Sequence, residues 1–112
     1  GQGKPVILSE FGAEALFGNR GRWRNHWSEE YQADVLDECL RVYLNHPDIV
    51  GAAIWQFSDC RVTESNFKWR PRTYNNKGTL DEYRRPKLAY ETVRQRMLEA
   101  RARWEEGPAH RG

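Results

Sequence analysis

The run KPVILSEFG at residues 4–12 restricts the fold of this chain more than any other segment, because it places apolar side chains in a row and closes on Glu10 and Gly12. A short apolar run bounded by turn residues is typical of a strand that is buried on both faces, as in a parallel sheet covered by helices. Ligands of such sheets and barrels bind beyond the carboxyl ends of the strands. Glu10 is therefore a candidate for chemistry, although a glutamate is also a common first residue of a loop.

The next segments predict a long loop and then a helix. Residues 12–27 carry glycine, asparagine and aromatic residues without a period, which indicates a loop. Ser28 is a suitable N-cap and the two acids that follow it suit a first helical turn, so we expect a helix that begins there and stops at residues 45–47. Helical spacing predicts this buried stripe: Tyr31, Val35, Cys39 and Val42, backed by Leu36, Leu40 and Tyr43.

A second apolar run, at residues 49–57, also ends in polar residues. A strand, a crossover that contains a helix, and a second apolar strand form a βαβ unit, which is expected to be parallel and right-handed. The carboxyl ends of both strands then open on the same side of the sheet. We therefore expect Glu10 and Trp55 to face one cleft.

The rest of the chain predicts a long loop at residues 60–83 and a final helix. Pro86 suits the first helical position. One face of this helix is expected to carry Ala89, Val93, Met97, Ala100 and Trp104. Residues 105–112 predict a flexible tail. A long aperiodic loop inside a compact domain is typical of a functional loop.

Composition narrows the classes of function. The 18 Lys and Arg residues against 16 Asp and Glu residues leave a net charge of +2, which is too small to indicate a nucleic-acid-binding protein. Five Trp, five Tyr and four Phe residues suit a carbohydrate or base-stacking site as well as a core. Cys39 and Cys60 match neither a metal-ligand spacing nor a disulfide framework. We expect no metal, no cofactor and a reducing, cytoplasmic compartment.

Two features place limits on the chain as a unit. No apolar segment approaches the roughly twenty residues that cross a membrane, so no membrane partner is expected. The chain starts at Gly1 without a Met, so residue 1 is not expected to be the native start. Two parallel strands cannot cover their own edges and faces. The predicted fold class is therefore α/β: residues 1–104 form the C-terminal part, about the last two β/α units, of a (β/α)8 TIM barrel.

Five motifs in this order strongly resemble the C-terminal end of the catalytic barrel of glycoside hydrolase family 2, specifically of β-glucuronidases. They are ILSEFG at 7–12, WSEEYQ at 27–32, GAAIWQFSD at 51–59, NNKG at 75–78 and RPK at 85–87. Each motif alone is weak, whereas the set, which covers about residues 4 to 98, is specific. The resemblance implies a longer enzyme with a jelly-roll domain and an immunoglobulin-like domain before the barrel.

The resemblance also implies roles for single residues. Glu10 matches the catalytic nucleophile of the family, and Trp55 matches a tryptophan that lines the sugar site. Asn75 and Lys77 match the pair that binds the carboxylate of the sugar. Arg72, together with Arg70, could add to this anion site, although the spacing departs from the family by about a residue.

The second carboxyl group that the chemistry needs is missing. A retaining glycosidase uses two carboxyl groups about 5 Å apart, one as nucleophile and one as acid/base. In the family the acid/base follows an asparagine at the end of an earlier strand, and no Asn-Glu pair occurs here. Glu14, Asp59 and Glu64 are loop acids to which we assign no such role. The isolated chain is therefore expected to be inactive.

The sequence hypothesis is a segment of a retaining exo-β-glucuronidase that acts on β-glucuronides, pairs with the rest of its barrel and forms homo-oligomers as the full-length protein. A β-galactosidase or β-galacturonidase of the same family is the nearest alternative. An alternative of another class is a nucleic-acid or protein interaction module that uses residues 20–27 and the arginine-rich last helix. The loop at residues 13–27 either shapes the entrance for the aglycone or is a solvated loop.

Overall fold

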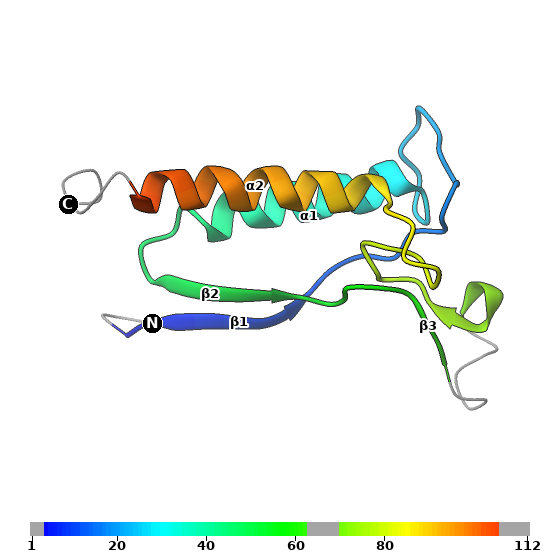
Figure 1. Ribbon diagram of the computed structural model, residues 1–112, viewed down its shortest axis with the longest axis horizontal. Coiled ribbons are helices and arrows are strands. Elements are labelled where there is room, and N and C mark those ends of the chain that lie inside the picture. The colour runs from blue at the N-terminus through cyan, green and yellow to red at the C-terminus, as the bar shows by residue number, and fades with distance from the viewer. Residues whose placement is uncertain (1–3, 63–69, 106–112) are drawn as a thin grey trace.

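The computed structural model describes residues 4–62 and 70–105, which form two layers, with helices on one side and strands on the other (Figure 1). The elements are β1 (Val6–Phe11), α1 (Glu29–Tyr43), β2 (Ile49–Ile54), β3 (Cys60–Arg61), the short 3-10 turn η2 (Pro71–Thr73), β4 (Tyr74–Asn75) and α2 (Leu88–Glu105). None of the helices in these ranges is long and apolar enough to span a membrane.

β1 and β2 form a parallel pair, and α1 lies in the crossover between them. The pairing aligns Leu8 with Ala52 and Phe11 with Ile54, with an irregular register between these two positions. The prediction of a parallel βαβ unit is thus confirmed. The small antiparallel pair β3–β4 lies beyond the carboxyl end of β2, at the right of Figure 1. Within the described residues, the loops that follow β1 and β2 therefore lie at the same end of the sheet.

α1 begins as predicted, because the Ser28 Oγ accepts a hydrogen bond from the Tyr31 N–H at 3.1 Å. The predicted stripe is confirmed at its two leucines and wrong at Val42. Leu36 and Leu40 are fully buried, whereas Val42 is 44% exposed. α1 packs along α2, and its Tyr43 ring contacts Phe11 of β1, so burial on α1 follows these contacts and not the most apolar line of the helix.

α2 begins at Leu88, so the prediction that Pro86 is its first residue is wrong. The reason is a local backbone pairing: Pro86 forms an antiparallel bridge with Leu80, and the Lys87 N–H donates to the Thr79 carbonyl at 2.9 Å. Ala89 and Ala100 are buried as predicted, whereas Met97 is 39% exposed. The side chain of Trp104 and residues 106–112 of the predicted tail lie outside the described part of the chain.

One face of the β1–β2 sheet is not covered by any other element of the described residues. Ile7 is 69% exposed and Val50 is 62% exposed, and both helices lie on one side of the sheet (Figure 1). The prediction of strands buried on both faces is therefore not met within this chain, because no second layer covers them. This exposed apolar surface agrees with the expectation that the two units form an incomplete fold. Cys39 and Cys60 are both free thiols.

Candidate active site

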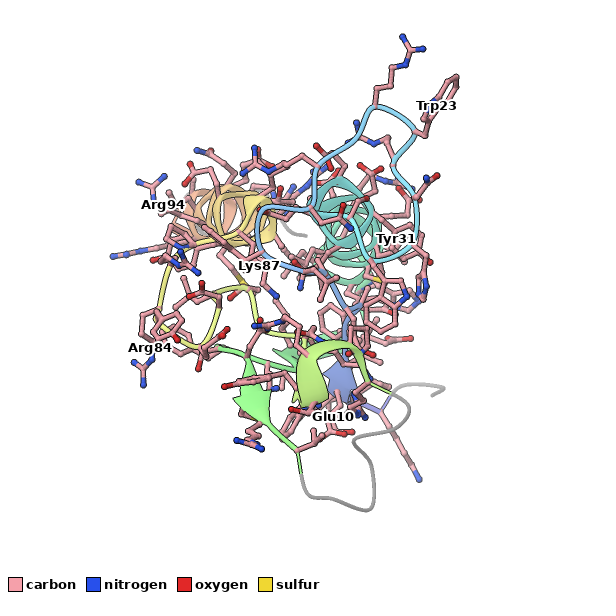
Figure 2. The ribbon with its side chains drawn as sticks, turned by 90° about the vertical axis from the view of Figure 1, so that its right-hand side faces the viewer. Glu10, Trp23, Tyr31, Arg84, Lys87 and Arg94 are labelled. Carbon is pink, nitrogen blue, oxygen red and sulfur yellow. The ribbon has the colours of Figure 1, made fainter. Side chains whose placement is uncertain are left out.

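Glu10 and Trp55 lie at the same end of the sheet, where β1 and β2 reach their carboxyl ends. Glu10 is exposed near the end of β1, and Figure 2 shows it on the strand side of the molecule, away from the two helices. Trp55 directly follows β2, and its backbone N–H donates a hydrogen bond to the Phe11 carbonyl at 2.9 Å. Its side chain is partly exposed, and the Trp55–Gln56 peptide bond is cis. Parallel pairing thus brings the backbone segments that carry Glu10 and Trp55 together at the carboxyl ends of the two strands.

The turn at residues 75–78 packs directly against the segment after β2. The Lys77 carbonyl accepts a hydrogen bond from the Gln56 N–H at 3.1 Å. The Asn75 side-chain oxygen accepts one from the Lys77 N–H at 3.0 Å, which closes a local turn. Among the described residues, the ammonium of Lys77 has no ion-pair partner. The turn that carries Lys77 is therefore hydrogen-bonded to the residue that follows Trp55.

A buried lysine lies behind this turn. Lys87 is almost fully buried, and Figure 2 shows it between the helix layer and the strand layer. Its Nζ donates to the Ala15 carbonyl at 2.7 Å, to Asp59 Oδ1 at 2.9 Å and to the Asn76 carbonyl at 3.0 Å. Burial lowers the pKa of Lys87 and raises the pKa of Asp59, and the ion pair between them offsets part of each shift.

Arg72 is held inside the loop by three partners. Its guanidinium donates to Asn76 Oδ1 at 2.6 Å, to Glu82 Oε2 at 2.7 Å and to Asp59 Oδ2 at 3.2 Å. These contacts already use most of its hydrogen-bonding groups. A direct role of Arg72 in substrate binding stays a prediction, and the observed role is to support Asn76.

The loop acids take different positions. Glu14 accepts hydrogen bonds from the Asn76 N–H at 3.1 Å and from Arg70 Nη1 at 3.4 Å, so the loop that follows β1 supports the turn through this carboxylate. Asp59 is buried beside Lys87. Glu64 lies outside the described residues.

Sequence reasoning missed two buried polar side chains of α1. Gln32 Nε2 donates to the Ala13 carbonyl at 3.0 Å and to the Gly78 carbonyl at 2.9 Å. Glu29 accepts from the Leu88 N–H at 2.7 Å and so satisfies the first turn of α2. Polar residues at a helix start are normally solvated, and nothing in their spacing indicated these partners.

The arginines behind the alternative of an interaction module are largely paired with acids. Arg20 contacts Glu29 at 3.3 Å, and Arg96 contacts Asp37 at 2.6 Å between the two helices. Arg24 is paired with Asp34 in the same way. These pairs neutralise part of the charge that a nucleic-acid surface requires. Trp23 nevertheless projects from the loop and is 74% exposed (Figure 2).

A pocket of about 330 Å³ lies between the end of β2 and α2. Its lining includes Ile54, Phe57, Tyr90 and Val93. None of the predicted site residues lines it. It is therefore distinct from the edge that carries Glu10.

Known proteins are similar to this chain in sequence and in structure. No protein-family model matches the chain. The structure superposes on a GH2 β-galacturonidase from Eisenbergiella tayi in complex with galacturonate, with a TM-score of 0.82 and 49% identity over 87% of this chain. It is also 32% identical over 95 residues to a β-glucuronidase of Streptococcus agalactiae. The chain belongs with the β-glucuronidase-like enzymes of glycoside hydrolase family 2.

This family 2 chain corresponds to only part of each relative. It covers 15% of the S. agalactiae β-glucuronidase and 17% of the E. tayi β-galacturonidase. A β-glucuronidase of Faecalibacterium prausnitzii shows the same relation, with a TM-score of 0.76, 32% identity, and coverage of 88% of this chain and 16% of the relative. The family 2 chain thus matches one restricted region of much longer enzymes.

Proposed function

We propose that the chain supplies the C-terminal part of the catalytic (β/α)8 barrel of a retaining, exo-acting β-uronidase. Terminal β-D-glucuronides are the first candidate substrates. The observation that supports this proposal is that backbone hydrogen bonds bring together, at the carboxyl ends of β1 and β2, the segments that carry three chemically different groups. These are the exposed carboxylate of Glu10, the ring of Trp55 and the unpaired ammonium of Lys77.

The proposed reaction assigns Glu10 to nucleophilic attack. Its carboxylate attacks the anomeric carbon of the sugar and forms a glycosyl ester, while the bond to the leaving oxygen breaks. A second carboxyl group, supplied by the part of the barrel outside this chain, protonates that oxygen and then takes a proton from the water that hydrolyses the ester. By itself the chain is therefore expected to be inactive.

Sugar recognition in this proposal comes from the other two groups. The Trp55 ring offers an apolar face for the sugar C–H groups. Lys77 and the Asn75 amide bind the uronate, since an ammonium and two N–H donors suit a carboxylate. Arg72 acts on the turn indirectly in this proposal, through its hydrogen bond to Asn76 Oδ1.

A β-galacturonidase is the second candidate. Identity to the E. tayi β-galacturonidase is 49%, against 32% for the S. agalactiae and F. prausnitzii β-glucuronidases. Both sugars carry the same carboxylate and differ in the configuration of one ring hydroxyl. Residues 75–77 therefore suit either sugar, and a substrate panel must decide between them.

The test uses the complete enzyme that contains this chain, assayed on aryl β-glucuronide, β-galacturonide and β-galactoside. We expect a uronide to be the best substrate, and we expect Lys77→Ala to reduce the uronide-to-galactoside ratio of kcat/KM by roughly 10- to 100-fold, because a hydrogen bond to a charged group contributes about 1.5–3 kcal/mol. Arg41→Ala, which removes an exposed cation on α1, is the matched control. A best activity on the galactoside, or an unchanged ratio in Lys77→Ala, would contradict the proposal.

A further inference from the structure

Three separate segments meet at the ammonium of Lys87. Ala15 belongs to the loop that follows β1, Asp59 to the segment that follows β2, and Asn76 to the turn at 75–78. An ammonium has three N–H donors, and each of these segments accepts one. The side chain of Lys87 is 0% exposed, so water does not compete for these hydrogen bonds.

These segments are the ones that carry the proposed substrate groups. The loop of Ala15 continues from Glu10, and the segment of Asp59 continues from Trp55. The turn of Asn76 carries Asn75 and Lys77. The hydrogen bonds of Lys87 thus link the segment of the proposed nucleophile Glu10, the segment of the sugar-binding residue Trp55 and the turn proposed to bind the uronate.

Neighbouring hydrogen bonds join the same segments. Asp59 Oδ1 also accepts from the Gly78 N–H at 2.9 Å, and the Ala15 N–H donates to the Asn76 carbonyl at 2.9 Å. Gln32 joins the same loop and turn from α1. Lys87 itself stands directly before α2, so the turn is connected to the helix layer as well.

We propose that Lys87 is a positioning residue for uronate recognition, whose buried ammonium holds the turn at 75–78 in register with the segments that carry Glu10 and Trp55. This inference rests on the proposed function. Loss of the ammonium removes one hydrogen bond from each of three acceptors in a buried site and takes one cationic partner from the Asp59 carboxylate, which favours displacement of the turn. A displacement of about 1 Å at a recognition group can change a rate about 100-fold.

The test compares Lys87→Met with wild type in the complete enzyme, using aryl β-uronide and the matching neutral aryl glycoside. The readout is the ratio of the two kcat/KM values, because this ratio does not depend on the fraction of folded enzyme. We expect the ratio to fall about tenfold or more, mainly through a higher KM for the uronide. Leu40→Ala is the control: it opens the buried core of α1 away from this site and lowers the Tm without a change in the ratio.

Asp59→Asn is the second variant, since it keeps the size of the side chain and removes the negative charge that pairs with Lys87 and Arg72. If Lys87→Met does not fold, Asp59→Asn tests the proposal in its place. We expect Asp59→Asn to lower the ratio of the kcat/KM values, but by less than Lys87→Met. A ratio that stays at the wild-type value in the folded variants, with a lower Tm as in Leu40→Ala, would show that Lys87 serves stability alone. If Lys77→Ala also leaves the ratio unchanged, the uronate assignment of the turn fails, which is a separate result.

Discussion

Glu10 and Lys87 illustrate two different situations of a charged residue at the same end of the sheet. Glu10 is exposed, and among residues 4–62 and 70–105 its carboxylate has no hydrogen-bond or ion-pair partner. Lys87 is buried, and its three donors are all satisfied. The first is available to a ligand, whereas the second is available only to its neighbours. This contrast is why we assign chemistry to Glu10 and positioning to Lys87.

The role of Glu10 can be tested by chemical rescue. In the complete enzyme we expect Glu10→Ala to lower kcat by at least about 1,000-fold, since a covalent nucleophile is lost. Added azide should restore turnover and give the α-glycosyl azide, because a single displacement at the anomeric carbon inverts a β-glycoside. Glu38→Ala, at an exposed position on α1, is the control with normal activity. A β-glycosyl azide would instead assign Glu10 as the acid/base.

Asp81 should contribute to stability in a pH-dependent way. Burial raises the pKa of its carboxyl, but hydrogen bonds from the Arg85 backbone and side chain and from the Tyr83 N–H more than compensate and hold the pKa below its usual value. A carboxyl with a lowered pKa stabilises the folded state above the unfolded pKa of about 4, and this contribution is lost as the pH falls through the lowered pKa.

Asp81→Asn should therefore reduce the Tm at pH 7 and have a smaller effect at the lowest pH at which the protein stays folded. Thermal unfolding of both proteins from pH 7 downwards measures this difference. The exposed acid Glu91, whose pKa is lowered mainly by a hydrogen bond from Gln95, offers the control Glu91→Gln with little change in Tm. A difference in Tm between wild type and Asp81→Asn that is constant across this range would be inconsistent with the titration.

At the level of elements, the close approach of the two strand ends depends on a glycine. A Cβ at Gly12 would lie 2.3 Å from the Trp55 carbonyl oxygen, which is backbone and cannot rotate away. β1 and β2 can thus converge after Phe11 only because this position has no side chain. The geometry of the proposed site therefore depends on the glycine at the junction between β1 and the loop that follows it.

Gly12→Ala should lower the stability of the complete enzyme by about 1–3 kcal/mol, the usual cost of overpacking, and should also lower kcat/KM because Glu10 and Trp55 are forced apart. Denaturant unfolding and steady-state kinetics measure the two effects. Gly21→Ala is the matched control, since a Cβ there meets no atom within 4 Å. Equal stability and activity of the two variants would argue against the observed packing.

At the level of the whole molecule, the uncovered face of the β1–β2 sheet is expected to pack against another part of the protein. Ile7 of β1 and Val50 of β2 expose apolar side chains, and both helices lie on one side of the sheet (Figure 1). Contiguous apolar surface of this kind is typical of an interface. The rest of the proposed barrel is the natural occupant, because the matched relatives are about six times as long as the region that this chain covers.

Ile7→Lys should have opposite effects in two contexts. The isolated chain should become more soluble, because an apolar side chain is replaced by a charge on an exposed face. The complete enzyme should lose about 3 kcal/mol or more of stability, because the same charge is then buried without a partner. Sedimentation of the isolated chain and the Tm of the complete enzyme provide the two measurements. An unchanged Tm in the complete enzyme would mean that this face is not covered there.

The sequence by itself determined the features that depend on local physics. The apolar runs predicted β1 and β2, Ser28 predicted the start of α1, and the order of the segments predicted a parallel pair with Glu10 and Trp55 at one edge. Hydrophobic periodicity and capping act within a few residues, so they can be read without the fold.

Only the tertiary structure decided which polar groups are buried and what they bind. Lys87, Asp59 and Asn76 come from three distant segments, and neither composition nor spacing shows that they share hydrogen bonds. The pairing of Pro86 with Leu80 likewise delayed the start of α2 to Leu88. Burial of a charge is favourable only when partners from elsewhere in the chain satisfy it, and those partners are brought together by folding alone.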